Sequence, residues 1–249
     1  MKVLEKIKEE FSDLVIENGF SKYEIKIQAR GLSSEEAIGN PKRDDFPLII
    51  GDEVMIQAQF KDSLGQAFTD HPGNFQGSLS KILDLSFDSN YHRALFIASV
   101  NAVLRSLSAA DKTVHCKDEE PHKCAKEMAE WISNNTDAVQ IGIVGYQPAI
   151  VEECSHIFGS DNIMVTDLNP TVIGEIKAGV EIWDGSRDTE SLIKNSDVVL
   201  ATGSSIINNT IDQIIRLVKK YEKEYYFFGN TIAGPAALLD LPRLCFYGH

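Results

Sequence analysis

We expect no export signal, membrane span or disulfide framework from this sequence. Residues 1–10 carry Lys or Glu every few positions and lack the apolar core of a secretory leader. No apolar run reaches the roughly 18 residues that cross a bilayer. The four cysteines, at 116, 124, 154 and 245, are too few and too unevenly spaced for a disulfide framework. We therefore expect a cytoplasmic protein with reduced thiols and no membrane partner.

Basic residues are also scarce, since 24 Lys and Arg stand against 37 Asp and Glu, a net charge of -13. An acidic surface repels phosphate backbones, so nucleic acid is not an expected partner. The hydrophobic fraction of 43% over 249 residues is that of an ordinary globular protein with a sizeable core. A homodimer is expected only because symmetric dimers are common.

The first part of the chain mixes helical and strand periodicity. Apolar residues at helical spacing predict a helix from residue 3 to 15, and a nearly continuous apolar set predicts a central, buried helix over 90–107. Strict alternation over 23–29 and 54–60 predicts two strands of a half-solvated antiparallel sheet. The turn-forming stretch 65–79 predicts a structured loop.

Residues 108–120 are polar and without period, so we place a domain boundary between 113 and 114. A helix is predicted from Pro121 to about 133, after which strands and helices alternate. Strands are predicted over 139–144, 162–166, 180–183, 197–201, 224–228 and 244–247, and helices over 148–157, 188–195, 206–222 and 233–240. Apolar strands separated by helices indicate an α/β fold, here a doubly wound, mainly parallel sheet.

Two turns of this second part are candidate binding elements. In a doubly wound sheet the ligand lies at the carboxyl edge where strand order reverses. This places the turn Gly145-Tyr146-Gln147-Pro148 beside the turn Thr202-Gly203-Ser204-Ser205. Helix amides after each turn suit an anionic group or a carbonyl oxygen. Glycine in such turns is also explained by backbone geometry alone.

Asp167, which ends the second predicted strand, has two interpretations. It stands where ribose is bound in dinucleotide-binding folds, or it caps its own turn with Asn169. The sequence lacks the G-x-G-x-x-G fingerprint, so a nucleotide cofactor is less favoured than a transition metal.

Thiols and imidazoles gather between positions 115 and 124. His115, Cys116 and Cys124 are candidate metal ligands because borderline and soft metals prefer such donors. Their spacing is not a zinc signature, and Cys124 shares a helical face with Met128, which makes a buried structural thiol the alternative.

Several motifs resemble the heavy-metal chelation family. They are I-G-I-V-G-Y-Q-P-A-I-V (141–151), T-G-S-S-I-I-N-N-T-I-D (202–212), and in the first part G-Q-A-F-T (65–69) and A-S-V-N-A-V-L (98–104). The resemblance implies an α+β domain like the enolase N-terminal domain, here 1–113, followed by a Rossmann-like domain, 114–249, with the site between them. It also implies roles for a set of matching residues: Asn101, Gly145, Thr202, Gly203, Asn208 and Thr210.

Two functions follow as hypotheses. The first is a protein that binds a metal or a small ligand in the cleft between the domains. The second is an enzyme that acts there on a nucleotide-like or carboxylated metabolite. Asn208 and Thr210 have a structural alternative, because both precede a predicted helix and could cap it.

Overall fold

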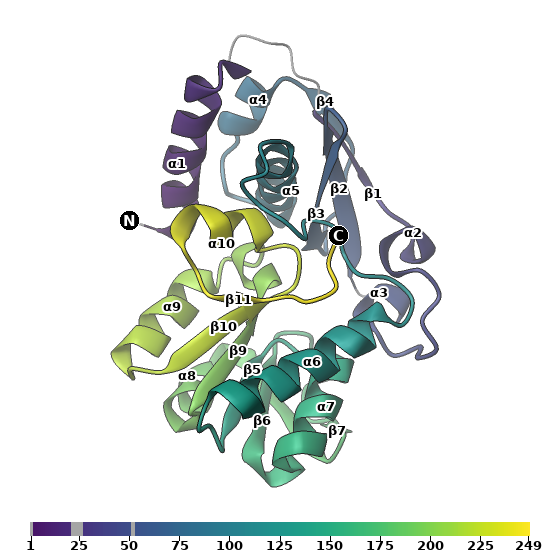
Figure 1. Cartoon of the computed structure of the whole chain (residues 1–249), viewed down its shortest axis with the longest axis vertical. Coiled ribbons are helices and arrows are strands. Elements are labelled where there is room, and N and C mark those ends of the chain that lie inside the picture. The colour runs from purple at the N-terminus through teal and green to yellow at the C-terminus, as the bar shows by residue number, and fades with distance from the viewer. Residues whose placement is uncertain (1, 21–26, 51–52) are drawn as a thin grey trace.

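A computed structural model of the chain describes residues 2–20, 27–50 and 53–249, and it contains two sheets (Figure 1). The upper sheet in that view is antiparallel and four-stranded, and the lower one is seven-stranded and mainly parallel. The fold class predicted from the sequence, an α+β part followed by a doubly wound α/β part, is confirmed.

The antiparallel sheet has the strand order β3-β2-β1-β4. Its strands are β1 (Ile27–Gly31), β2 (Val54–Phe60), β3 (Ser63–Thr69) and β4 (Phe75–Gly77). The accompanying helices are α1 (Val3–Glu17), α2 (Ser34–Ile38), α3 (Pro47–Ile50), α4 (Leu79–Leu83) and α5 (Asn90–Ser106). The predicted strand over 54–60 and both predicted helices are confirmed, whereas most of the predicted strand over 23–29 lies outside the described residues.

The loop predicted over 65–79 is confirmed only at residues 70–74, because the stretch also contributes most of β3 and all of β4. Gly65 explains the error: a Cβ there would come within 2.4 Å of the Ala98 oxygen of α5. A turn-forming residue is therefore needed inside the strand, so that the sheet can pack directly on the helix backbone. α5 is accordingly buried around its whole circumference, as the sequence predicted.

The second sheet has the strand order β11-β10-β9-β5-β6-β8-β7. Its strands are β5 (Ile141–Val144), β6 (Ile163–Asp167), β7 (Ile176–Lys177), β8 (Val180–Asp184), β9 (Val198–Thr202), β10 (Glu224–Phe228) and β11 (Arg243–Leu244). The helices are α6 (Glu120–Asn135), α7 (Pro148–Phe158), α8 (Gly185–Asn195), α9 (Ile211–Lys220) and α10 (Ala233–Leu239). All strands but β7 run parallel.

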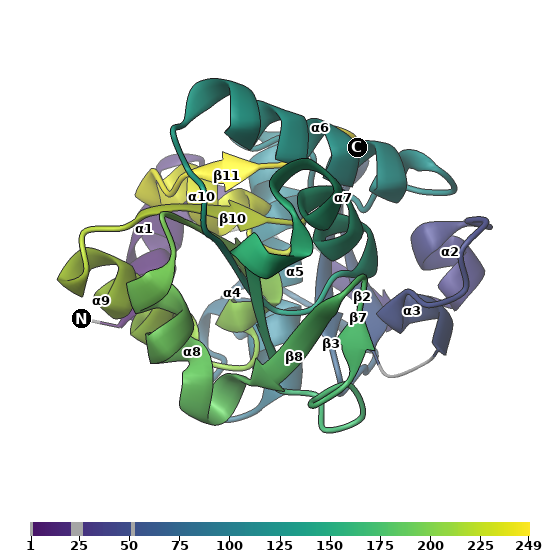
Figure 2. The same ribbon diagram turned by 90° about the horizontal axis from the view of Figure 1, so that it is seen from below.

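Helices cover both faces of this sheet (Figure 2). Val198 and Leu200 of β9 pack in a cluster with α6 and α7, whereas Val199 and Ala201 pack with α8 and α9. If the six parallel strands are numbered 1 to 6 as they follow in the chain, from β5 to β11, they lie side by side in the order 6-5-4-1-2-3. The order therefore reverses between β5, which is strand 1, and β9, which is strand 4. A ligand site is therefore expected outside the carboxyl ends of these two strands.

Three predictions for the second part need correction. β7, a two-residue antiparallel edge strand, was not predicted, since so short a segment carries no period. The last strand is at Arg243–Leu244 rather than 244–247. The helix predicted over 206–222 is α9, which begins only at Ile211 and ends at Lys220, because the preceding Gly203–Ile206 forms a separate 3-10 turn.

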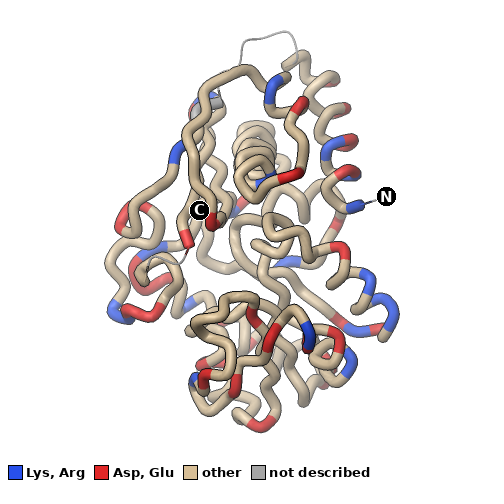
Figure 3. The backbone as a smooth tube through the Cα atoms, turned by 180° about the vertical axis from the view of Figure 1, so that it is seen from behind, with Lys and Arg blue, Asp and Glu red and all other residues tan. Residues whose placement is uncertain are grey.

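Acidic and basic residues occur along the backbone of both parts (Figure 3). No helix in the described ranges is long and apolar enough to cross a membrane.

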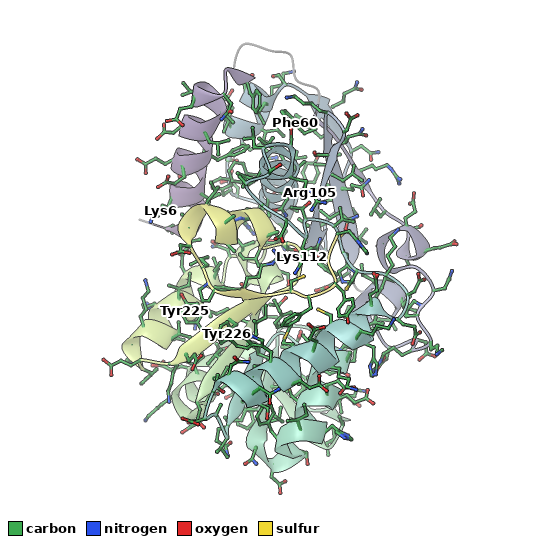
Figure 4. All side chains as sticks on the ribbon, in the orientation of Figure 1. Lys6, Phe60, Arg105, Lys112, Tyr225 and Tyr226 are labelled. Atoms are coloured by element: carbon green, nitrogen blue, oxygen red, sulfur yellow. The ribbon has the colours of Figure 1, made fainter. Side chains whose placement is uncertain are left out.

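The two parts are joined by the segment after α5 and by the end of the chain. Val114 and His249 exchange two backbone hydrogen bonds, of 2.8 and 2.9 Å. The ammonium of Lys112, which lies at the junction in Figure 4, donates to the Cys245 carbonyl at 2.6 Å. Both hydrophobic clusters draw residues from either side of position 113, so the domain boundary stays a prediction.

Candidate functional site

A cavity of about 550 Å³ opens at the carboxyl edge of the parallel sheet. Its floor is formed by the ends of β5, β6, β9 and β10, and its wall by residues of the first part, among them Phe46 and Phe68. Every site residue predicted from the sequence lines this cavity, except Asn101.

The turns after β5 and β9 lie against each other, as predicted. Gly145 has φ +95°, and a Cβ there would lie 2.5 Å from Thr202 Cγ2. Gly203 is equally confined, since its Cβ would come 2.8 Å from the Cβ of Ile232. Glycine at these positions thus permits the close approach of neighbouring strand ends.

Asp167 joins the turn after β5 to the end of β6. Its Oδ2 accepts a hydrogen bond from the Tyr146 amide at 2.6 Å, and its Oδ1 accepts one from the Asn169 amide at 2.7 Å. Burial raises the pKa of this carboxyl above its usual value, and the two amide hydrogen bonds oppose that shift. Asp167 therefore caps its own turn and also fixes the neighbouring one.

The helix starts beside the cavity are capped by the protein itself. The Gln147 side chain accepts from the Ile150 amide at 2.6 Å, and Thr202 Oγ1 accepts from the Ser204 amide at 3.3 Å. Together with the bond from Tyr146 to Asp167, these contacts occupy amides that an anionic ligand would need.

Asn101 does not line the cavity and lies between β3 and α10. Its Nδ2 donates to the carbonyls of Gln66, Asn230 and Thr231 at 2.9, 3.2 and 3.1 Å, and its Oδ1 accepts from the Gly234 amide at 2.7 Å. Its hydrogen-bonding capacity is therefore used in joining the two parts.

Asn208 and Thr210 do line the cavity, but neither caps α9 through its side chain. Thr210 Oγ1 instead donates to Asn208 Oδ1 at 2.7 Å. The capping alternative is wrong because Thr210 has helical backbone angles, whereas a capping residue is extended.

The predicted metal ligands His115, Cys116 and Cys124 lie along one wall of the cavity, together with Cys245. Burial lowers the pKa of His115 to about 4 and raises the pKa of the Cys116 thiol. A hydrogen bond between the thiols of Cys124 and Cys245 raises the pKa of Cys124 and lowers the pKa of Cys245. Cys245 could not be predicted as a neighbour, because more than 100 residues separate it from the others.

These donors do not form a chelating centre. Among the described residues, no group of three or more His, Cys, Asp or Glu side chains is placed to hold a metal ion. The His122 side chain instead contacts Glu153, with His122 Nε2 3.3 Å from Glu153 Oε1.

Three further cavity residues are notable: Thr166 and Asn230 were not predicted, and Ser205 was predicted only as the end of the turn 202–205. Each is at most 1% exposed, and each has a side-chain oxygen without a hydrogen-bond partner. The sequence signal was present, because each polar residue stands at or just after the carboxyl end of an apolar strand.

The fold and cavity define a two-part α/β protein with a candidate ligand site at the topological switch point of its parallel sheet. Residues 129–233 match the model of the DUF364 family, described as "Putative heavy-metal chelation". The resemblance inferred from the sequence motifs is thereby confirmed. No curated protein matches this chain in sequence.

Two solved structures of that family are similar to this chain. A protein of unknown function from Pyrococcus horikoshii aligns with a TM-score of 0.57 at 17% identity, over 92% of this chain and 79% of its own. Another, from Desulfitobacterium hafniense, has a TM-score of 0.48 at 12% identity, over 75% and 72%. At its level of identity, the first similarity supports the fold alone.

Proposed function

We propose that this protein binds a small organic ligand in the cavity at the switch point. One observation carries the proposal: four of the five unpaired, buried polar side-chain atoms in the described part of the chain belong to residues that line this cavity. They are His115 Nδ1, Thr166 Oγ1, Ser205 Oγ and Asn230 Oδ1.

An unpaired buried polar group costs about 1–3 kcal/mol, so four around one cavity are a substantial penalty. These atoms have almost no accessible surface, so a ligand would offset that cost by forming hydrogen bonds with them once their side chains turn towards the cavity. The cavity volume is typical of ligand sites, which span about 300–1,000 Å³, and apolar side chains such as Phe228 and Met128 complete its lining.

The family description points to a heavy metal, and the thiols of Cys116, Cys124 and Cys245 are donors that soft metals prefer. The described side chains nevertheless do not fit a chelating centre, because no three donors converge. We therefore assign the binding to an organic molecule, in contact with a set of turn and strand-end residues: Gly145, Tyr146, Asp167, Thr202, Gly203, Ser204, Asn208 and Thr210.

A fragment library screened by ligand-observed NMR tests the proposal. Ser204 lines the cavity and is partly exposed, so Ser204→Trp places a bulky ring at the site. Ser191→Trp is the matched control, since Ser191 is exposed on α8 and away from the cavity.

We expect fragments that bind the native protein and the Ser191 variant but not the Ser204 variant, with circular dichroism confirming that both variants fold. Binding that survives Ser204→Trp, or no binding at all, would contradict the proposal.

A further inference from the structure

The cavity has an uneven charge, which bears on the class of its ligand. Three acidic residues line it, Glu53, Asp70 and Asp167, whereas no Lys or Arg is among its described lining residues. Among these described lining residues, His115 is the one that carries an ionisable nitrogen. Because its pKa is lowered by burial, this imidazole is neutral at pH 7.

Asp70 and Asp167 differ in their partners. The Asp70 carboxylate accepts from Asn90 Nδ2 at 2.7 Å and lies 2.9 Å from His71 Nδ1. The Asp167 carboxylate accepts hydrogen bonds from backbone amides, among them those of Tyr146 and Asn169. Asp167 is therefore a half-buried carboxylate in the cavity that is hydrogen-bonded but has no cationic side chain among these contacts.

The unpaired atoms of other residues that line the cavity favour the same ligand chemistry. Asn230 Oδ1 can only accept a hydrogen bond, and its own Nδ2 is directed to the Thr113 carbonyl at 3.5 Å. The hydroxyls of Thr166 and Ser205 can accept as well as donate. A ligand rich in N–H donors would pair more of these atoms than one rich in acceptors.

An anionic ligand, by contrast, has little to bind. No basic side chain is available in the described lining, and the amides of Tyr146, Ile150 and Ser204 already donate to Asp167, Gln147 and Thr202. A phosphate or carboxylate would have to displace these caps and lie near Asp167.

Resting on the function proposed above, we infer that the ligand is an organic cation, an amine-bearing molecule whose ammonium group is received by the Asp167 carboxylate. This disfavours the nucleotide-like or carboxylated metabolite considered from the sequence. A hydrogen bond between two charged groups discriminates strongly, so an amine should bind at least about tenfold more tightly than the matching carboxylate.

The test uses probes that share a ring and differ in charge: benzylamine, benzyl alcohol and benzoate, with the same three groups on cyclohexyl and indole scaffolds. Dissociation constants are measured by ligand-observed NMR for the native protein and for Asp167→Asn. Asp161→Asn is the matched control, because Asp161 is exposed and away from the cavity.

The expected result is a preference for amines of at least about tenfold, kept in the Asp161 variant and abolished in the Asp167 variant. Carboxylates that bind as tightly as amines, with binding still lost in Ser204→Trp, would overturn this inference and leave the proposed function standing. A preference that survives Asp167→Asn would overturn the role of Asp167. If no scaffold binds in any form, both proposals fail.

Discussion

Buried polar side chains are treated differently in the two parts of the molecule. In the antiparallel part, all six such side chains among the described residues have partners within the protein: Gln66, Thr69, Arg93, Ser99, Asn101 and Thr113. In the parallel part three of the six carry an unpaired oxygen, namely Thr166, Ser205 and Asn230, and all three line the cavity.

The comparison separates structural polar groups from candidate binding groups. A satisfied buried group such as Asn101 stabilises the fold and has no capacity left for a ligand. An unsatisfied one such as Asn230 costs stability in the free protein and is retained where something else can pair with it. Each of the following measurements can break or sharpen this distinction.

The largest effect is expected for Asn101→Ala. It removes four hydrogen bonds and leaves the Gly234 amide and three carbonyls without their buried partner, so the free energy of unfolding should fall by about 3–5 kcal/mol. Asn230→Ala is the control, because it removes only contacts of 3.5 and 3.7 Å and should cost about 1 kcal/mol. Urea unfolding measures both, and equal losses would remove the distinction between the two asparagines.

The second effect is on the pH dependence of stability. The His115 pKa is about 4 in the folded protein against an unfolded value near 6.5, so as pH falls the unfolded chain takes up the proton first. The contribution of neutral His115 to the free energy of unfolding is therefore fully present above about pH 6.5. It falls by about 3 kcal/mol as the pH drops to about 4. His115→Leu should lack this loss. Urea unfolding at pH 7, 5.5 and 4 tests it, and parallel profiles for the two proteins would refute the assignment.

The smallest effect compares two fully buried threonines. Thr113 Oγ1 donates to the Leu64 carbonyl at 2.7 Å, so Thr113→Val should lower the free energy of unfolding by about 1 kcal/mol. The Thr166 hydroxyl has no partner, so Thr166→Val should leave stability unchanged or raise it by up to about 1 kcal/mol. Thermal and urea unfolding of both variants decide the matter. A loss at Thr166 as large as that at Thr113 would show that its hydroxyl is satisfied after all.

Much of this arrangement could be predicted from the sequence. Apolar runs separated by helical segments predicted the parallel sheet, and the usual strand order placed Gly145 beside Thr202. These predictions succeed because both depend on local period and on general rules of chain topology.

The failures share another physical cause. Gly65 favoured the prediction of a loop where β3 lies, because glycine is typical of turns. Its actual role is to allow a close contact with α5, more than 30 residues away in the sequence. The proximity of Cys245 to Cys124, and the missing partners of Ser205 and Asn230, likewise depend on residues distant in the chain. No local pattern encodes which polar atoms remain unpaired, since this is settled only when the tertiary structure is complete.

The reciprocal pairing of Val114 with His249 has a consequence for cooperativity. His249 pairs with the segment that follows α5. Together with the hydrogen bonds of Asn101 to Asn230, Thr231 and Gly234, this pairing joins the antiparallel part to the parallel one. Neither part can melt without exposing a surface that the other one covers, so the polypeptide should lose its structure in a single step rather than in two.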